Sequence, residues 1–496
     1  MMSKMVKGSE DVHIPMRFRA GVKNMFFDWW YVEAGYGMPF WRFYQDMYGT
    51  HPWLSPYGIE LKILKPEITD YPIAADDPLG LVGAYSTLMY DNGKYRLWYC
   101  TYDFSETGIQ ENDKLCYMES DDCKHWVRPE LSLIEYKGSK SNNIVYGWGN
   151  ESVGGVLGAH GATVFKDESA PAHERYKLVH LGQATQVKDV FNWIYGAVSP
   201  DGIHWRLLDK PILEYLSDTQ SVACYIEHNK RGKYVLYVRG WSPQNRHGFG
   251  GRRIVRKTES RQFGKFPPPK AVLTPEISWG PSADIYTNSY NRWPGADMAH
   301  IMFPTIYHRD TDTLSLHLAL SRDGDRWFFP SQSALYSNEE NPEKVTTYAG
   351  VGLVPYEGNH WALPVFFSRR SHNEYRAERP AIFLATVRED GIAGIEASLM
   401  GEFYTYPCVF KGSEMRINSL SYPGGEIKIE VLELKPKLEA PPFEGFTLND
   451  CDPIKGNNHW TPVTFNRKGN ISKLAGKIVR FRFKLIRSRI FGFMFV

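Results

Sequence analysis

The hydrophobic pattern of the chain predicts β-strands along most of its length. Short runs rich in β-branched and aromatic residues are bounded by turn residues, as in KYRLWYC at 94–100 after the DNG turn at 91–93, and KYVLYVRGW at 233–241. Runs of this length and composition are typical of strands. Between about residues 60 and 400 they come in groups of four.

A seven-residue motif, Ser-x-Asp-x-x-x-Trp, divides these strands into repeats. Clear copies stand at 120–126, 199–205 and 321–327, and weaker copies at 260–266 and 388–394. The copies begin 79, 61, 61 and 67 residues apart. Four strands per unit of this length are typical of one blade of a β-propeller, so the repeat predicts a five-bladed propeller over residues 61–400.

The motif itself has a structural interpretation. An aspartate in a turn accepts hydrogen bonds from backbone N–H groups, a glycine supplies the positive φ, and the tryptophan packs between sheets. We therefore expect the aspartates of the motif to hold turns and not to take part in catalysis.

After about residue 400 the repeat ends and the strands alternate strictly between apolar and polar positions. Val479, Phe481, Phe483 and Leu485 share one face of a strand, and Arg480, Arg482 and Lys484 share the other. This alternation predicts a C-terminal β-sandwich over 401–496. Packing support is the simpler role for it, and glycan binding is the alternative.

Composition and charge restrict the partners. The chain has 58 Lys and Arg against 56 Asp and Glu, so it lacks the basic field that gathers nucleic acid. No stretch has the 18 to 20 apolar residues of a membrane span, and residues 1–21 lack the apolar core of a secretory signal. A cytoplasmic protein and a processed secreted or periplasmic one fit equally well.

Cofactor motifs are absent from the sequence. It has no H-E-x-x-H, no His/Cys cluster and no phosphate-binding glycine loop, and its six cysteines form no C-x-x-C pair. We expect free thiols, no metal and no cofactor, while a structural calcium ion in the propeller channel is left open.

Aromatic residues make up 15% of the chain, and 13 of them lie between Phe26 and Tyr57. At this density, without a strand or helix period, residues 1–60 are predicted to form a wrapping segment or a pocket lid. Rings such as Trp30 would stack on the C–H faces of sugars. The alternative is packing on the propeller or on a second subunit in a homo-oligomer.

The motif turns SPDGIHW and SRDGDRW, the five-unit spacing and the terminal sandwich resemble the superfamily of glycoside hydrolase families 32, 43 and 68. Runs such as DTQSVACY and KYVLYVRGW are most similar to bacterial proteins described as family-32-like. The resemblance extends from about residue 60 to the end. It implies a glycosidase acting on an oligo- or polysaccharide, but not fructoside specificity, because the W-M-N-D-P-N-G signature is absent.

The resemblance implies paired carboxylates in the central pocket, at the beginnings of the innermost strands. One would act as general acid and the other as base or nucleophile. We expect Asp77 to be the base or nucleophile, and Asp218 to be a second pocket carboxylate that orients the sugar or tunes a neighbour. Asp284 or Glu343 would be the acid, and Glu151 is the remaining acid at such a position.

Further residues near the same end of the propeller are expected to bind substrate. They are His160, Gln220, Arg239, Arg370 and His372. For His160, a hydrogen-bonded core histidine without contact to substrate is an equal alternative. Guanidinium groups suit carboxylate, sulfate or phosphate, with an ion pair to a pocket acid as the simpler alternative. A glycan phosphorylase or transglycosylase with an arginine-lined anion site is therefore a second hypothesis, and a non-catalytic glycan-binding propeller is a third.

Overall fold

The computed structural model describes residues 15–34, 56–104, 110–147, 159–182, 193–228, 231–242, 251–374, 380–433 and 441–496. Within these ranges the protein is all-β, with strands and a few short 3-10 turns. It divides into two compact units. Unit 1 contains 1–64, 293–298 and 388–496, and unit 2 contains 65–292 and 299–387. Among the described residues no helix has the length and apolar character needed to cross a membrane.

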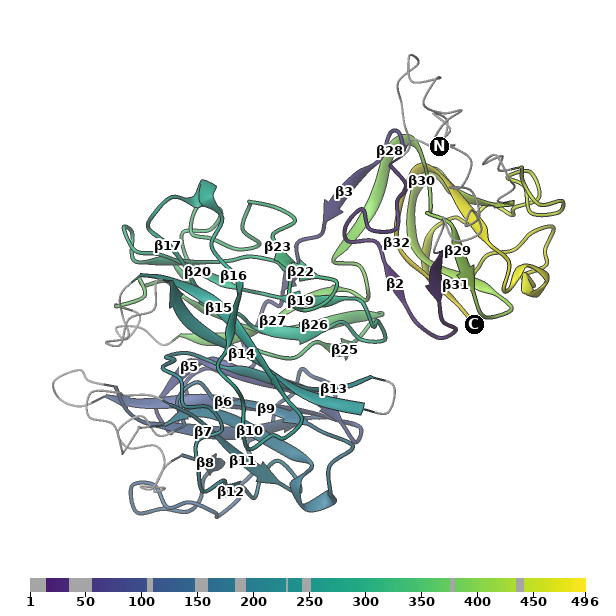
Figure 1. Ribbon diagram of the computed structural model, residues 1–496. Coiled ribbons are helices and arrows are strands. Elements are labelled where there is room, and N and C mark those ends of the chain that lie inside the picture. Colours follow the sequence, from purple (N-terminus) through teal and green to yellow (C-terminus); the bar gives the residue numbers. More distant parts are fainter. Residues whose placement is uncertain are drawn as a thin grey trace, which may run out of the picture. The chain divides into compact units, whose positions relative to one another are not determined.

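The first three repeats of unit 2 form three antiparallel sheets of four strands each, in chain order (Figure 1). The first sheet contains β5 (Leu81–Asp91), β6 (Lys94–Phe104), β7 (Gln110–Ser120) and β8 (Ile144–Tyr146). The second contains β9 (Thr163–Lys166), β10 (Tyr176–Gly182), β11 (Trp193–Ser199) and β12 (Arg206–Leu207). The third contains β13 (Val222–His228), β14 (Arg231–Ser242), β15 (Arg252–Ser260) and β16 (Lys270–Leu273).

The fourth repeat forms two smaller sheets because its strands are interrupted. One sheet contains β17 (Ala283–Thr287), β20 (Thr305–His308) and β21 (Thr313–Leu316), and the other β18 (Tyr290–Arg292), β19 (His300–Met302), β22 (Ala319–Ser321) and β23 (Trp327–Phe328). The break between β17 and β18 contains Ser289 with a φ of 41°, and the break between β19 and β20 contains Pro304, which has no N–H to donate. Together the two sheets follow the strand order of a single four-stranded sheet.

The fifth sheet joins the two ends of unit 2. It has the order β24 (Thr346–Ala349), β26 (His360–Ser368), β27 (Ala381–Arg388) and β4 (Glu67–Ile68), with β25 (Val354–Tyr356) also paired to β26. The short strand β4 comes from before the first repeat, and the N–H of Thr69 donates to the carbonyl of Leu384 at 2.9 Å. The outermost strand of the last sheet is therefore supplied by the beginning of the unit.

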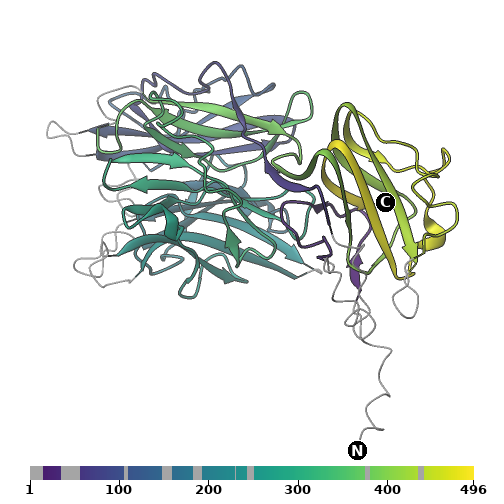
Figure 2. The ribbon, with the colours of Figure 1, turned by 90° about the horizontal axis from the view of Figure 1, so that it is seen from above.

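The first and last sheets also meet through their first strands. The N–H of Leu88 on β5 donates to the carbonyl of Val351, which follows β24, at 2.7 Å, and the N–H of Val351 donates to the carbonyl of Ser86 at 2.8 Å. On its other side β5 contacts β9, where the N–H of Val164 donates to Thr87 Oγ1 at 3.2 Å. The sheets thus close into a ring, and the purple and green strands of its two ends lie side by side in both views (Figures 1 and 2).

Closure of the ring depends on a glycine, and this dependence can be tested. Gly352 has a φ of 118°, and a Cβ there would lie 1.9 Å from the carbonyl oxygen of Leu88. Gly93 also has a positive φ, 80°, but no atom lies within 4 Å of its Cβ position. Gly93→Ala should cost about 1 kcal/mol of unfolding free energy from backbone strain, and Gly352→Ala clearly more, because the clash adds to the strain. Urea unfolding measures both, and equal losses would contradict this role of Gly352.

The motif turns have the structure expected from the sequence. Asp122 Oδ1 accepts the backbone N–H groups of Lys124 at 2.9 Å and His125 at 2.8 Å. Asp201 and Asp323 accept equivalent pairs of N–H groups in their own turns. Several hydrogen bonds lower the pKa of Asp122, and the one from the backbone N–H of His125 has the largest effect. The turn-holding role of the motif is thereby confirmed.

Unit 2 also buries histidines inside its sheets. The Nδ1 of His180 lies 2.9 Å from the carbonyl of Leu181, and its Nε2 lies 3.2 Å from the hydroxyl of Tyr146. Burial lowers the pKa of His180 from 6.5 to about 4, that of His300 to about 4 and that of His317 to about 3. All three are therefore neutral in the folded protein at neutral pH.

These histidines predict a loss of stability in mild acid. Because the unfolded state binds protons near pH 6.5 and folded His180 only near pH 4, its contribution is complete above pH 6.5 and is lost as the pH falls to 4. The shift corresponds to about 3 kcal/mol for this residue. Denaturant unfolding at several pH values should give a shallower pH dependence for His180→Gln than for wild type, and an unchanged one for the exposed control His173→Gln. An unchanged slope in His180→Gln would contradict the prediction.

Unit 1 is one hydrogen-bonded sheet of eight strands. They are β1 (Met16–Phe18), β2 (Asn24–Met25), β3 (Glu60–Ile63), β28 (Ala393–Tyr404), β29 (Cys408–Phe410), β30 (Met415–Glu433), β31 (Asn457–Pro462) and β32 (Val479–Phe495). The expected boundary at residue 400 falls inside β28. Residues 415–421 and 426–433 belong to the single strand β30, because both segments pair with β32 and residues 422–425 form a bulge between them.

The core of unit 1 contains the apolar face expected from the sequence. Val479, Phe481, Phe483 and Leu485 are all fully buried. Phe26 packs on Phe403, Phe483 and Phe493, with ring centres 5.4 to 5.8 Å apart. This part of the aromatic segment therefore packs inside unit 1, while Trp29 and Trp30 are about half exposed and residues 35–55 lie outside the described ranges.

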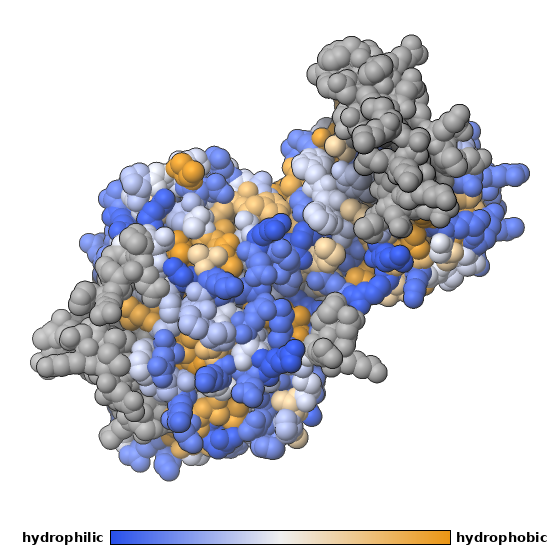
Figure 3. Space-filling model, in the orientation of Figure 1, coloured by the Kyte–Doolittle hydropathy of each residue, from blue (hydrophilic) through white to orange (hydrophobic). Residues whose placement is uncertain are grey.

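The surface of the two units is mixed. On the face that Figure 3 shows, apolar side chains form small areas separated by hydrophilic ones. Such scattered apolar residues are usual on protein surfaces and by themselves indicate no binding site.

Candidate active site

A cavity of about 190 Å³, called the central cavity below, lies where the first strands of the sheets in unit 2 begin. It is lined by Ala84, Tyr85, Tyr102, His160, Asp218, Tyr286, Tyr348, Phe366, His372 and Asn373. Tyr85, Tyr286 and Tyr348 lie on β5, β17 and β24, while His160 and Asp218 come shortly before β9 and β13. Each of the five repeats therefore contributes a side chain from its first strand or from the residues just before that strand.

Among the described residues that line this cavity, Asp218 is the one with a carboxylate side chain. It forms an ion pair with Arg239, whose side chain is only 1% exposed, whereas the side chain of Asp218 is 30% exposed. The guanidinium carbon of Arg239 also lies 4.6 Å from the centre of the Tyr286 ring. A buried permanent cation thus holds Asp218 at the cavity wall.

His160 is held by a second carboxylate, Asp113. The Nδ1 of His160 is hydrogen-bonded to Oδ2 of Asp113, which is fully buried on β7, and the edge of the ring packs against Tyr85. A carboxylate at one nitrogen fixes the orientation of an imidazole. The pair therefore holds a group that can donate or accept a proton at the cavity wall.

Asp113 was missed in the sequence, although a signal for it exists. The expected acids lie at the beginnings of first strands, whereas Asp113 lies near the beginning of the third strand of its sheet. In an antiparallel sheet of consecutive strands, the first and third strands run in the same direction and begin at the same edge. A search that included third strands would have found it.

His372 lies between two tyrosine hydroxyls of the cavity wall. Its Nδ1 is 3.0 Å from the hydroxyl of Tyr348, and its Nε2 is 3.0 Å from the hydroxyl of Tyr286. A neutral imidazole has one donor and one acceptor nitrogen, so one hydroxyl accepts and the other donates. His372 thereby fixes the two phenol groups that face the cavity.

Asp284 and Gln220 are buried beside the cavity and do not line it. Asp284 is paired with Arg253 through Nη1 and with Arg309 through Nε, each at 2.6 Å. Gln220 donates from Nε2 to the carbonyls of Ser86 at 3.1 Å and Ala162 at 3.0 Å. Gln220 thus joins two neighbouring sheets, and Asp284 holds two arginines together.

Asp77 lies at a different hollow. Its buried carboxylate accepts the hydroxyl of Tyr99 at 2.6 Å and the N–H of Leu79 at 2.9 Å, and lies 3.1 Å from Arg128 Nε. The hollow has a volume of about 350 Å³ and is lined by Asp76, Asp77, Pro78, Gly80, Leu81, Val82 and Pro380. None of these residues lines the central cavity.

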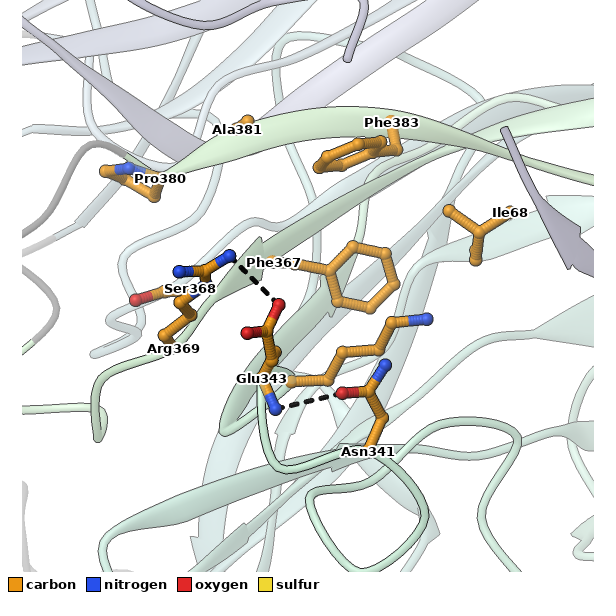
Figure 4. Close-up of a pocket in the computed structure, with 10 residues that line it drawn as sticks. Ile68, Asn341, Glu343, Phe367, Ser368, Arg369, Pro380, Ala381 and Phe383 are labelled. Carbon is orange, nitrogen blue, oxygen red and sulfur yellow. Dashed lines mark hydrogen bonds and ion pairs between the residues drawn. The ribbon is translucent and has the colours of Figure 1, made fainter. Parts of the chain in front are cut away.

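Glu343 lines a third hollow, of about 370 Å³, whose walls include Phe367 and Phe383 (Figure 4). It forms an ion pair with Arg369 at 2.9 Å, and both side chains are more than 60% exposed. The neighbouring Arg370 uses its carbonyl to accept the hydroxyl of Thr346.

The expected site residues are therefore distributed over several places. The structure brings Asp218, His160 and His372 to one cavity, with Arg239 directly behind it. Trp30 lies in unit 1, and Glu151 lies outside the described residues. In the described part of the chain, no three His, Cys, Asp or Glu side chains cluster as metal ligands would.

No protein-family model and no curated protein matches this sequence. Solved structures that resemble it include a glycoside hydrolase, with 14% identity over 66% of this chain and 92% of that chain and a TM-score of 0.45. A thermostable family-43 glycoside hydrolase has 14% identity over 65% of this chain and 96% of that chain, with a TM-score of 0.43. A glycosyl hydrolase from Bacteroides ovatus has 14% identity over 72% of this chain and 97% of that chain, with a TM-score of 0.40. These structural neighbours are glycoside-hydrolase-like proteins. At such identities and TM-scores, the activity of this chain has to be inferred from its own residues.

The pairing of Asp218 with Arg239 predicts an asymmetric effect on stability. Asp218→Ala leaves a buried guanidinium without its carboxylate and should lower the unfolding free energy by about 3 kcal/mol. Arg239→Met leaves a carboxylate that water can reach and should cost less. The double variant should recover part of the loss of Asp218→Ala. Denaturant unfolding measures all three, and a larger loss for Arg239→Met than for Asp218→Ala would contradict the buried pair.

Proposed function

We propose that the protein is a glycoside hydrolase that cleaves a glycosidic bond of an oligo- or polysaccharide in the central cavity of unit 2. In this proposal the ring of sheets is a five-bladed propeller. One observation carries it: the carboxylate of Asp218 and the carboxylate-held imidazole of His160 face the same aromatic-walled cavity. A base and a proton carrier on one cavity are what glycosidic cleavage requires.

The cavity walls suit a sugar ring. Tyr85, Tyr286, Tyr348 and Phe366 supply aromatic surface, against which the C–H faces of a pyranose pack. Polar groups from Asp218, His160, His372 and Asn373 line the same space and can bind hydroxyls. A volume of about 190 Å³ lies below that of cavities for drug-sized ligands, so it fits about one sugar unit.

Asp218 takes the role of base or nucleophile in this proposal. Its pairing with the permanent cation Arg239 keeps a negative charge at the cavity wall, where it can attack the anomeric carbon or activate a water molecule. The sequence assigned this role to Asp77, whose carboxylate is instead engaged by Tyr99, Leu79 and Arg128.

His160 takes the role of the acid. In this role its imidazolium donates a proton to the oxygen of the leaving group, while the hydrogen bond to Asp113 holds the ring in place for the transfer. The second carboxylate of the site thus acts through a histidine. Asp284 and Glu343, the two acids expected from the sequence, are each paired with arginine.

Turnover on a panel of defined oligosaccharides tests this proposal. Asp218→Asn and His160→Gln should each lower kcat by about 10² to 10⁴, the usual contribution of a general acid or base. Glu343→Gln, at an exposed position of unit 2, is the matched control and should leave kcat unchanged. Circular dichroism and the unfolding transition establish that each variant is folded.

Two results would contradict the proposal. Folded Asp218→Asn and His160→Gln proteins with full turnover would remove the assignment of the site. A wild-type protein that binds an oligosaccharide in calorimetry and releases no product over days would instead be a glycan-binding propeller.

A further inference from the structure

Three arginines gather behind the Tyr286 wall of the central cavity. The guanidinium carbons of Arg239 and Arg253 lie 4.6 Å and 5.3 Å from the centre of the Tyr286 ring. Arg309 shares the carboxylate of Asp284 with Arg253. Burial, together with the nearby Arg253, lowers the pKa of Arg239, which shows that two cations are held close together.

The charges of this cluster do not balance. Among the described residues, the three guanidinium groups form ion pairs with two carboxylates, Asp218 and Asp284. One positive charge is left over. A local excess of positive charge attracts an anion, most strongly where part of the cluster, here Arg239, is buried.

The hydrogen bonds are also incomplete. The Nε and Nη1 atoms of Arg239 and the Nε atom of Arg253 are buried and have no acceptor in the part of the chain that the structure describes. An unsatisfied buried donor costs about 1 to 3 kcal/mol. Such donors are typical of a site in which a ligand supplies the missing acceptors.

The cluster is partly exposed and lies next to residues that line the cavity. The side chains of Arg253 and Arg309 are 20% and 42% exposed. The Tyr307 ring joins them to the cavity, since its centre lies 5.5 Å from the guanidinium carbon of Arg253 and 5.2 Å from the ring of His372. A group attached to a sugar in the cavity would therefore meet Arg253 and Arg309, with Arg239 adding positive potential through Tyr286.

We propose that Arg253 and Arg309 form an anion subsite, and that the substrate is an acidic glycan whose oxyanion binds there. This inference rests on the proposed function. A sugar carboxylate matches the planar guanidinium with two oxygens, and a sulfate ester or free phosphate offers the same chemistry. The ion pairs with Asp284 hold both guanidinium groups in place, so the subsite is formed before the ligand binds.

Matched substrates test the subsite. We compare two oligosaccharides of identical linkage, one with a uronic acid and one with the corresponding neutral sugar, and a sulfated form of the neutral one. Wild type should have a KM at least tenfold lower for an acidic substrate. Arg309→Met and Arg253→Met should remove this difference, Arg309→Lys should restore part of it, and the exposed control Arg261→Met should leave it unchanged.

The outcomes separate this inference from the proposed function. If wild type cleaves neutral and acidic substrates equally well, or if the arginine variants weaken both equally, the subsite is wrong while the hydrolase proposal stands. If turnover requires inorganic phosphate and yields a glycosyl phosphate, the anion is free phosphate, and both the acidic substrate and the hydrolase proposal are wrong.

A binding measurement covers the case in which no cleavage is observed. Calorimetry with the same oligosaccharides should show that Arg309→Met loses affinity for the acidic one at least tenfold and keeps its affinity for the neutral one. Equal affinities of wild type for both would overturn the subsite independently of any activity.

Discussion

Closure of the ring of sheets is the constraint on which the rest of unit 2 depends. The backbone hydrogen bonds between Leu88, Val351 and Ser86 join the first sheet to the last, and β4 adds its edge to β27. Because the ring closes, the beginnings of all first strands meet at one place. Residues as distant in sequence as Tyr85 and His372 therefore line a cavity that no single sheet could form.

The charged groups around that cavity are arranged in pairs from different strands. Asp218 precedes β13 and is held by Arg239 of β14, and His160 precedes β9 and is held by Asp113 of β7. Each pair combines one partly accessible group with one buried group that fixes it. This arrangement places a carboxylate and an imidazole at the cavity with little freedom to reorient, which is the preorganisation that catalysis requires.

Local features could be predicted from the sequence, and features that depend on tertiary partners could not. The motif turns were predictable because Asp122 accepts N–H groups from its own turn, and the apolar face of β32 follows from strict alternation. The two-residue strand β4 carries no pattern, and β30 became one strand because its partner β32 pairs with both halves.

The same distinction applies to the site. The rule that selects acids before first strands includes Asp218, but it also includes Asp77 and Asp284, because the sequence does not reveal which acid faces the cavity. Asp284 differs from Asp218 in having two guanidinium partners and no access to the cavity. The rule does not include Asp113, because this residue lies near the beginning of a third strand.

The most direct test of the account is a crystal structure of the Asp218→Asn variant soaked with an oligosaccharide that the wild type binds. The account predicts a sugar ring in the central cavity, within hydrogen-bonding distance of the side chain at position 218 and of His160. Sugar density in the hollow beside Asp77 or in the hollow beside Glu343, with the central cavity empty, would contradict it.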